Sequence, residues 1–276
     1  MRLLITGAAG MLGQDLVAIA DDAVALSRAE LDITDAAAVD AAVSAAAPDV
    51  VVNCAAYTNV DGAEQAVLDA LAVNGRGAGN VARAAQAAGA WIVHISSDYV
   101  FDGSKREPYL EPDDPAPLSQ YGISKLAGER AVAEVAPETH TIVRSSWLFG
   151  TGGPCFPATI LRLAAERDTL TVVDDQVGCP TYTGHLAAAL LQLAGARPIG
   201  LVHVTGGGHC SWFEFARQIV GEAGLECEVT PGRTEDLARP APRPAYSVMR
   251  SERGAPELPS WRQGLADYLA ARVVSA

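Results

Sequence analysis

Tyr121 and Lys125 lie four residues apart, and this spacing places both side chains on one face of a helix. Upstream, Ser96 and Ser97 end a predicted strand. A free phenol has a pKa of about 10, which is too high for ready proton exchange at neutral pH. A nearby ammonium group favours the phenolate and lowers that pKa. The set Ser97, Tyr121 and Lys125 therefore predicts a site that transfers a proton to or from an oxygen atom.

A glycine-rich loop near the N-terminus predicts a second function. Three glycines follow the first predicted strand and open the first predicted helix, namely Gly7, Gly10 and Gly13. The first glycine permits a tight turn, the second lets a pyrophosphate approach backbone amides, and the third lets helix and strand pack closely. The loop therefore predicts a dinucleotide site, and a positively charged nicotinamide ring beside Tyr121 would also favour the phenolate.

The end of the second predicted strand, Val24–Leu26, indicates which dinucleotide binds. The next residues are Ser27 and Arg28, with no carboxylate at that point to accept hydrogen bonds from ribose hydroxyls, as in NAD-dependent enzymes. A hydroxyl and a guanidinium suit a 2′-phosphate, because arginine binds it through two hydrogen bonds. We therefore expect NADPH as the cofactor, with NADH left open. The alternative is that Arg28 is a solvated surface residue.

Short β-like runs alternate with longer alanine-rich stretches over the first two thirds of the chain. The predicted strands are Leu3–Thr6, Val24–Leu26, Val50–Asn53, Ile92–Ser96 and Thr141–Arg144. The predicted helices are Met11–Ala20, Ala36–Ala46, Ala66–Ala88 and Ser119–Ala136. This alternation is typical of right-handed βαβ units. The predicted fold class is therefore α/β, a Rossmann-type doubly wound parallel sheet with a smaller mixed α/β substrate domain.

The pattern loosens after about Gly150. The elements predicted there are a helix, a strand, a helix with a capping box and a final apolar helix: Ala158–Arg167, Gly200–Thr205, Ser211–Gly221 and Trp261–Val273. The proline-dense stretch 231–259 precedes the final helix, so we expect it to cross the surface and dock. The predicted domains are 1–145 for the dinucleotide and 146–276 mainly for the substrate, with segments that cross back to the first domain.

Composition and charge exclude several classes of protein. Of 276 residues, 49% are hydrophobic and 19% charged, which is too apolar for a disordered chain. No apolar run is long enough for a membrane span or a signal peptide, so we expect a cytoplasmic protein. The formal net charge of −13 speaks against a nucleic-acid partner and requires a locally basic pocket for any anionic substrate. The five cysteines form no CxxC pair, and we expect reduced thiols.

Six segments occur in a characteristic order along the chain. They are Asn53–Asp61, Ser97–Gly103, Tyr121–Glu129, Arg144–Gly150, Asp174–Thr181 and Arg243–Ser247. Together with the glycine loop they resemble the dTDP-4-dehydrorhamnose reductase family, within the extended short-chain dehydrogenase/reductase superfamily, and the likeness covers nearly the whole chain. The resemblance implies an NADP-dependent oxidoreductase that reduces the C4 keto group of dTDP-4-dehydro-L-rhamnose to give dTDP-L-rhamnose, in nucleotide-sugar biosynthesis.

The resemblance also implies roles for particular residues. Tyr121 would protonate the C4 oxygen, Lys125 would bind the nicotinamide ribose, and Ser97 would hydrogen-bond the carbonyl oxygen. The cofactor would contact Tyr121 and Lys125. Together with Arg28, the other residues expected at the cofactor are Gly7, Gly10, Met11, Leu12, Gly13, Asp32, Ile33, Ala55, Ala56 and Tyr57. The substrate would contact Asp98, Val100, Trp147, Thr181 and Arg243, the last through its diphosphate.

The chain departs from the family pattern in three places, one of which is Val248 and Met249 after the Arg243–Ser247 segment, where leucine and Asp or Asn are usual. The segment Gly150–Phe156 lacks the asparagine pair that usually precedes the phenylalanine, which leaves the exact sugar open. Some members dimerise around Mg²⁺ held by acidic side chains. Asp15 matches one such position, but Gly184 and His185 stand where the other acids would be. We therefore predict no metal site, and either a monomer or a homodimer.

Two other functions stay open. One is a 4-ketoreductase for another dTDP-deoxysugar in secondary metabolism. The other is a non-catalytic NADP-binding regulatory subunit, similar to the one that partners methionine adenosyltransferase. The intact Ser97, Tyr121 and Lys125 argue against a regulator, because it has no need of a tuned phenol.

Overall fold

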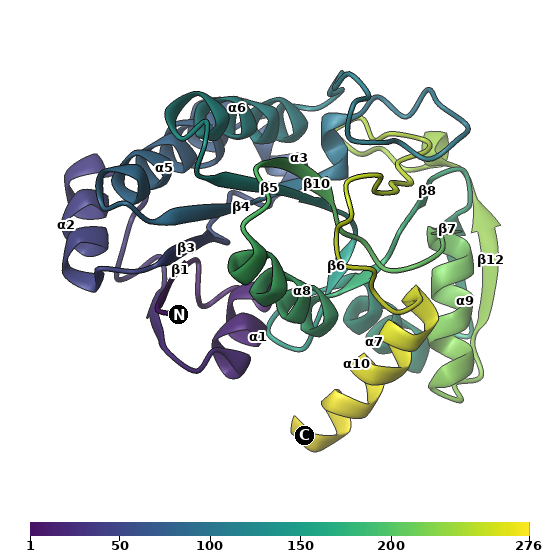
Figure 1. Ribbon diagram of the computed structural model, residues 1–276. Coiled ribbons are helices and arrows are strands. Elements are labelled where there is room, and N and C mark those ends of the chain that lie inside the picture. Colours follow the sequence, from purple (N-terminus) through teal and green to yellow (C-terminus); the bar gives the residue numbers. More distant parts are fainter. Residues whose placement is uncertain (276) are drawn as a thin grey trace.

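Within residues 1–275, which the computed structural model describes, six parallel strands form the central sheet (Figure 1). Its order is β10-β5-β4-β3-β1-β2. The strands are β1 (Leu3–Thr6), β2 (Ala23–Leu26), β3 (Val50–Asn53), β4 (Trp91–Ser97), β5 (His140–Ser145) and β10 (Gly200–His203). The order reverses between β1 and β3, and ligands of such sheets bind at the carboxyl ends beside that point. The predicted Rossmann-type parallel sheet is confirmed.

Helices cover both faces of this sheet, because its central strands are buried and apolar on both sides. One face carries α1 (Met11–Ile19) and α8 (Thr183–Ala196). The other face carries α2 (Ala36–Ala46), α5 (Ala78–Ala87) and α6 (Gln120–Val135) (Figure 1). Since α8 and β10 come from the second half of the chain, that half supplies part of the sheet and its cover.

The single helix predicted over Ala66–Ala88 is wrong in one respect. After the short helix α3 (Val60–Ala63), the stretch forms α4 (Val67–Leu71), a π-helical turn (Ala72–Gly77), and then α5. The wide turn carries Asn74, whose side chain bonds to a neighbouring loop and to α6 instead of facing solvent. Alanine content predicts helix, but it does not predict a turn that depends on tertiary contacts. Turns of this kind frequently mark functional sites.

The second half of the chain builds a smaller apolar core beside the sheet. Its helices are α7 (Phe156–Glu166), α9 (Trp212–Glu222) and α10 (Trp261–Ser275), which confirms the three predicted helices with slightly shifted bounds. Three strand pairings in this half were not predicted from the sequence. They are β7 (Thr169–Val173) with β12 (Glu228–Gly232), β8 (Val177–Gly178) with β11 (Cys210–Ser211), and β6 (Leu148–Phe149) with β9 (Thr181–Tyr182).

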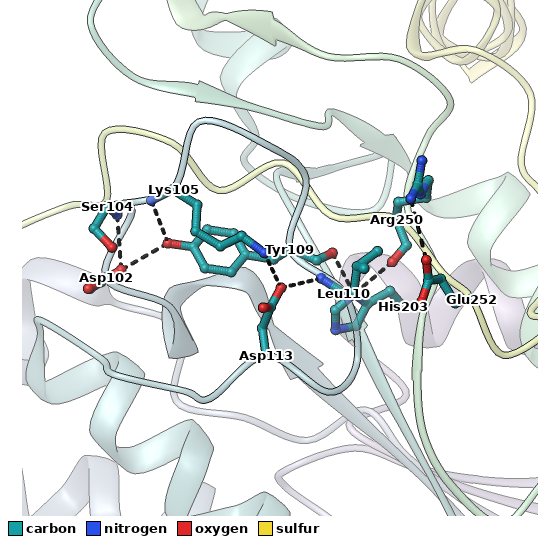
Figure 2. A network of polar contacts seen from close by, with 9 residues as sticks. All are labelled: Asp102, Ser104, Lys105, Tyr109, Leu110, Asp113, His203, Arg250 and Glu252. Carbon is teal, nitrogen blue, oxygen red and sulfur yellow. Dashed lines mark hydrogen bonds and ion pairs between the residues drawn. The ribbon is translucent and has the colours of Figure 1, made fainter.

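The proline-dense stretch before α10 docks on the molecule, as predicted. Tyr109 donates its backbone N–H to the carbonyl of Val248 at 2.8 Å and accepts from Arg250 N–H at 3.0 Å. Figure 2 shows His203, from the end of β10, beside Tyr109 and Arg250 of this contact. Its Nδ1 lies 3.2 Å from the carbonyl oxygens of Tyr109 and Arg250. The network holds the C-terminal stretch against the carboxyl edge of the sheet.

Two further observations concern the chain as a whole. All five cysteines are free thiols, as predicted. No helix within residues 1–275 combines the length and the apolar character that crossing a membrane requires.

One buried ion pair joins α6 to the sheet. Arg144 of β5 donates from Nε and Nη2 to the two carboxylate oxygens of Glu129, at 2.8 and 2.7 Å. The Ser96 hydroxyl donates to the same carboxylate at 2.5 Å. The side chains of Arg144 and Glu129 are only 4% and 7% exposed, so removal of either partner leaves a buried charge without compensation.

We predict that Arg144→Met, which keeps most of the side-chain bulk, lowers the free energy of unfolding by about 3–5 kcal/mol. The matched control is Arg162→Met, which breaks an exposed pair with Glu166 and should cost less than about 1 kcal/mol. The double variant Arg144→Met, Glu129→Met should recover much of the loss, because no unpaired charge remains. Urea unfolding followed by circular dichroism measures all three. Equal losses for Arg144→Met and Arg162→Met would contradict the argument.

Candidate active site

Ser97 and Asp98 stand at the carboxyl end of β4, and both are buried. The Ser97 hydroxyl donates to Oδ1 of Asp98 at 3.0 Å, and the Ser247 hydroxyl donates to Oδ2 at 2.6 Å. Burial raises the pKa of Asp98 to about 6, against the lowering effect of these two hydroxyls. Ser247 belongs to the docked C-terminal stretch. The Asp98 carboxylate therefore links the end of β4 to the second half of the chain.

Helix α6 brings Tyr121 and Lys125 to the same edge. Ser119 caps the helix by accepting the N–H of Gly122 at 3.1 Å. A Cβ atom on Gly122 would lie 2.2 Å from the carbonyl oxygen of Tyr99, so only glycine lets the first turn of α6 approach the end of β4 this closely. The rings of Tyr99 and Tyr121 meet edge to face, with centroids 5.6 Å apart.

The electrostatics of Tyr121 differ from the prediction. Burial raises its pKa to about 12, and the negative charge of Asp98 acts in the same direction, while a hydrogen bond with Ser97 opposes both. The Lys125 ammonium group donates to the carbonyl of Ile95 at 2.7 Å. The protein alone therefore keeps the phenol protonated at neutral pH.

Lys125 is 3% exposed and has a pKa lowered to about 8. Burial is the main cause, and the nearby Glu129 carboxylate opposes it. The Cys54 thiol, directly after β3, lies close enough to feel the charge of Lys125. Burial raises the pKa of Cys54 to about 12, so this thiol stays protonated. Lys125 thus stands between α6 and the loop that follows β3.

The turn between β1 and α1 has the shape that a dinucleotide phosphate requires. Gly7 has a φ of +68°, and a Cβ atom there would lie 2.6 Å from the backbone nitrogen of Ala55. A Cβ atom on Gly13 would lie 2.4 Å from the carbonyl oxygen of Gly7. Gly10 has no side chain to cap α1, so the first backbone amides, among them that of Met11, are open to an anion. These residues fit the pyrophosphate of NADP.

The end of β2 holds a carboxylate that the sequence analysis did not expect. The backbone N–H of Ala8 donates to the Leu26 carbonyl at 3.1 Å, so the glycine loop touches this strand end. Glu30 folds back and accepts the N–H of Ser27 at 2.8 Å, and this bond holds its pKa below the usual range. The expectation of no carboxylate here is wrong, because the turn brings Glu30 back. Arg28 is exposed beside it.

The loop after β3 carries Ala55, Ala56 and Tyr57, all half-buried. The side chain of Asn74 holds this loop by accepting the Tyr57 N–H at 2.8 Å and donating to the Tyr57 carbonyl at 3.1 Å. It also donates to the Ser124 hydroxyl at 2.9 Å. Asn74 was not predicted as a site residue. An asparagine inside an alanine-rich helix is nevertheless a signal, because its side chain competes with helical hydrogen bonds.

Several predicted contact residues have side chains that serve the fold. Those of Leu12, Ile33, Val100 and Thr181 are buried, and the Thr181 hydroxyl accepts the N–H of Gly206 at 3.0 Å. Asp32 is exposed, and its carboxylate accepts from the backbone and hydroxyl of Thr34. Ligand contacts from these side chains stay a prediction. Trp147, which is half-buried, lies just beyond the end of β5.

Arg243 has a partner that was not foreseen. Its Nη2 donates to Oδ2 of Asp61 at 3.0 Å, and Arg239 donates to the same oxygen at 3.1 Å. The Ala241 N–H binds the other oxygen at 3.2 Å. These contacts, that of Arg243 first, lower the pKa of Asp61 to about 2. Arg243 also interacts with the phenol of Tyr99, next to Tyr121. The predicted diphosphate contact therefore lies in a cationic cluster.

His185, one of the positions considered for a metal site, pairs with an acidic residue of α10. His185 Nε2 lies 2.8 Å from a carboxylate oxygen of Asp267. Within the described residues, no group of three histidine, cysteine or acidic side chains is arranged to bind a metal ion.

Known proteins resemble this chain over nearly its whole length. The family model described as RmlD substrate binding domain matches residues 1–274. The dTDP-4-dehydrorhamnose reductase of Streptomyces griseus is 46% identical, and the match covers 96% of this chain and 92% of that protein. A dTDP-4-keto-6-deoxy-D-glucose reductase of Streptomyces niveus is 42% identical, over 90% of this chain and 88% of that protein.

A solved structure matches the fold closely. The crystal structure of dTDP-4-dehydrorhamnose reductase from Bacillus anthracis in complex with NADP superposes with a TM-score of 0.95 at 40% identity. The match covers 98% of this chain and 99% of that one. Identity at this level over nearly full length leaves no room for a different family. The chain belongs to the dTDP-4-dehydrorhamnose reductase family, as its motifs predicted.

Proposed function

We propose that this protein reduces the C4 keto group of dTDP-4-dehydro-L-rhamnose with NADPH. One observation carries the proposal. Ser97, Tyr121 and Lys125 meet at the carboxyl ends of the sheet, beside the turn after β3 that touches Gly7 of the glycine loop. A proton donor and a dinucleotide site are therefore adjacent, as carbonyl reduction requires. The named activity of the Streptomyces griseus relative and the NADP complex of the Bacillus anthracis relative support the same reaction.

The chemistry of the chain's own residues is proton delivery and charge stabilisation. NADPH, when bound, supplies the hydride that adds to the carbonyl carbon. Tyr121, protonated at neutral pH, donates its hydroxyl proton to the carbonyl oxygen, so that hydride and proton together give the alcohol. The Ser97 hydroxyl, next to that phenol, turns its one proton from Asp98 to the same oxygen and stabilises its developing charge, while Asp98 keeps the hydrogen bond from Ser247. Lys125 contributes a positive charge below pH 8.

Two observations favour a second candidate, a 4-ketoreductase acting on another dTDP-deoxysugar. The segment Gly150–Phe156 departs from the family pattern. The Streptomyces niveus relative is named for dTDP-4-keto-6-deoxy-D-glucose. The test follows the loss of NADPH absorbance with each ketosugar separately and identifies the product. Faster turnover of dTDP-4-keto-6-deoxy-D-glucose would transfer the assignment to the second candidate. NADPH binding without turnover of either sugar would favour the regulatory subunit.

We also propose that the division of labour follows the chain, with residues 1–145 mainly for the cofactor and 146–276 mainly for the dTDP-sugar. The cationic cluster of Arg239 and Arg243 comes from the second part, and the glycine loop comes from the first. A dTDP-sugar is the expected small-molecule partner. A monomer or a homodimer in the cytoplasm fits the reaction, which needs no second chain and no membrane.

Tyr121→Phe should lower kcat by about 10²–10⁴-fold, because it removes the general acid while keeping the ring. The affinity for NADPH, measured by fluorescence titration, should stay unchanged. Tyr182→Phe is the matched control, since it removes a phenol from the smaller core and should leave kcat as it is. If Tyr121→Phe turns over at the unaltered rate, another group donates the proton.

Arg28 and Glu30, which follow the end of β2, should have opposite effects on the choice between NADPH and NADH. Arg28→Ala should raise the KM for NADPH about ten- to hundredfold with little change for NADH, because it removes a charge-assisted contact to the 2′-phosphate. Glu30→Gln should raise the KM for NADH and leave that for NADPH unchanged or lower, since a carboxylate at this place accepts from ribose hydroxyls and repels a phosphate. Equal effects of each variant on both cofactors would remove both residues from cofactor selection.

The lowered pKa of Lys125 predicts a pH dependence. An ammonium group loses its charge as pH rises through its pKa, so kcat/KM for NADPH, which reports the free enzyme, should fall above pH 8. Tyr121 still carries its proton there, because its pKa is about 12. The dissociation constant for NADPH should rise over the same range, with circular dichroism as the check that the fold persists. A kcat/KM that stays constant up to pH 10 would contradict the assignment of this pH dependence to Lys125.

A further inference from the structure

Trp147 has an unusual backbone conformation. Within the described residues, three non-glycine residues have positive φ: Ala47 at 43°, Trp147 at 48° and Arg197 at 52°. Ala47 and Arg197 end helices α2 and α8, where the left-handed conformation is common. Trp147 ends no helix and lies between β5 and β6. A bulky residue keeps this conformation only where its surroundings enforce it, and such residues cluster at functional sites.

Two neighbouring residues hold Trp147 in this conformation. The indole of Trp147 stacks on that of Trp212, with centroids 3.5 Å apart and planes inclined by 3°. Gly178 lies against the same indole, since a Cβ atom there would come within 2.4 Å of Cε2 of Trp147. Gly178 belongs to β8, which pairs with β11 to form a short ribbon in which Ser211 lies opposite Val177, and Trp212 begins α9 directly after that ribbon. A single structural unit therefore holds the indole.

The ribbon is itself firmly fixed. Ser211 caps α9 by accepting the N–H of Glu214, whose carboxylate accepts the Ser211 N–H in return. The Ser211 hydroxyl also donates to Asp174 at 2.5 Å. Behind the stack, the ring of Phe156 packs on Trp212 with centroids 4.5 Å apart. Trp212 thus has little freedom to follow Trp147 if the latter moves.

Trp147 lies at the edge of the sheet that carries the candidate site. Ser145, the last residue of β5, pairs with Ser97 of β4. Beyond it, the Ser146 hydroxyl donates to the Cys179 carbonyl at 2.6 Å, and the Trp147 carbonyl accepts the Thr181 N–H at 3.2 Å. The backbone is therefore tied down on both sides of Trp147, and the half-buried indole stands two residues beyond the strand partner of Ser97.

We propose that Trp212 and Gly178 are positioning residues for the sugar: they clamp the Trp147 indole as a fixed wall beside Ser97 and Tyr121. The inference rests on the proposed function, in which a ketosugar lies at this edge with its C4 oxygen toward Tyr121. The wall sets how the sugar ring is oriented toward the proton donor. A misplacement of about 1 Å at such a site costs about 10²-fold in rate, so the clamp affects kcat/KM for the ketosugar and leaves the cofactor site untouched.

The experiment compares Trp212→Leu, Trp212→Phe and Gly178→Ala with Trp91→Phe. Trp91 stands at the opposite end of β4 from Ser97 and serves as the matched control. Gly178 has no positive φ, so an alanine there meets resistance from the indole and not from the backbone. Two indoles stacked this closely couple their electronic transitions, and this coupling contributes a signal to the far-ultraviolet circular dichroism. Trp212→Leu and Trp212→Phe should remove this signal, and Trp91→Phe should keep it.

We expect Trp212→Leu and Gly178→Ala each to lower kcat/KM for the ketosugar about ten- to hundredfold, with the KM for NADPH little changed, at a temperature at which circular dichroism shows both variants folded. Trp212→Phe, which restores a flat ring, should recover much of the activity. Unchanged kcat/KM in Gly178→Ala and Trp212→Leu would overturn the proposal, as would equal losses for the ketosugar and for NADPH. A wild-type protein that binds NADPH but turns over neither ketosugar would overturn the proposed function instead.

Discussion

The ion pair between Glu129 and Arg144 fixes the helix that carries Tyr121 and Lys125 to the strand beside Ser97. Both charges are buried, and the Ser96 hydroxyl completes the hydrogen bonds of the carboxylate. Because the pair is bidentate, it sets the rotation of α6 as well as its distance from the sheet. The charge of Glu129 also affects the site. Burial lowers the pKa of Lys125, and the nearby Glu129 carboxylate opposes this lowering. One interaction therefore contributes both to the position of α6 and to the ionisation of Lys125.

Close packing on α6 reinforces that attachment. A Cβ atom on Gly128 would lie 2.1 Å from the carbonyl oxygen of Asn74, and one on Gly122 would lie 2.2 Å from that of Tyr99. Larger residues at these positions would push α6 away from the π-helical turn and from the end of β4. The same contacts bring Asn74 to the loop after β3, so the cofactor side and the proton donor are held by one helix.

The sequence predicts the sheet well, because buried parallel strands are continuous apolar runs such as Val50–Asn53 and the glycine loop marks the first turn. It also predicts that Tyr121 and Lys125 share one helix, because their four-residue spacing is local, and that Ser97 lies at a strand end. What it misses depends on contacts between distant segments. Glu30 reaches the end of β2 only through a turn, and the short strands β6, β8, β9 and β11 are too brief to show a period.

The same limit explains the electrostatic difference at Tyr121. The four-residue spacing to Lys125 predicts a lowered pKa, but burial by tertiary packing raises the pKa of Tyr121. Likewise, the sequence identifies Arg243 without its counter-ion Asp61, which is 182 residues away. Asp61 keeps its charge at any neutral pH, since its pKa is about 2. Two guanidinium groups on one carboxylate leave a surplus positive charge, so this acidic protein has a local place for an anion. A diphosphate bound there would share Arg243 with Asp61, and its affinity would reflect that competition and not the full strength of a free guanidinium.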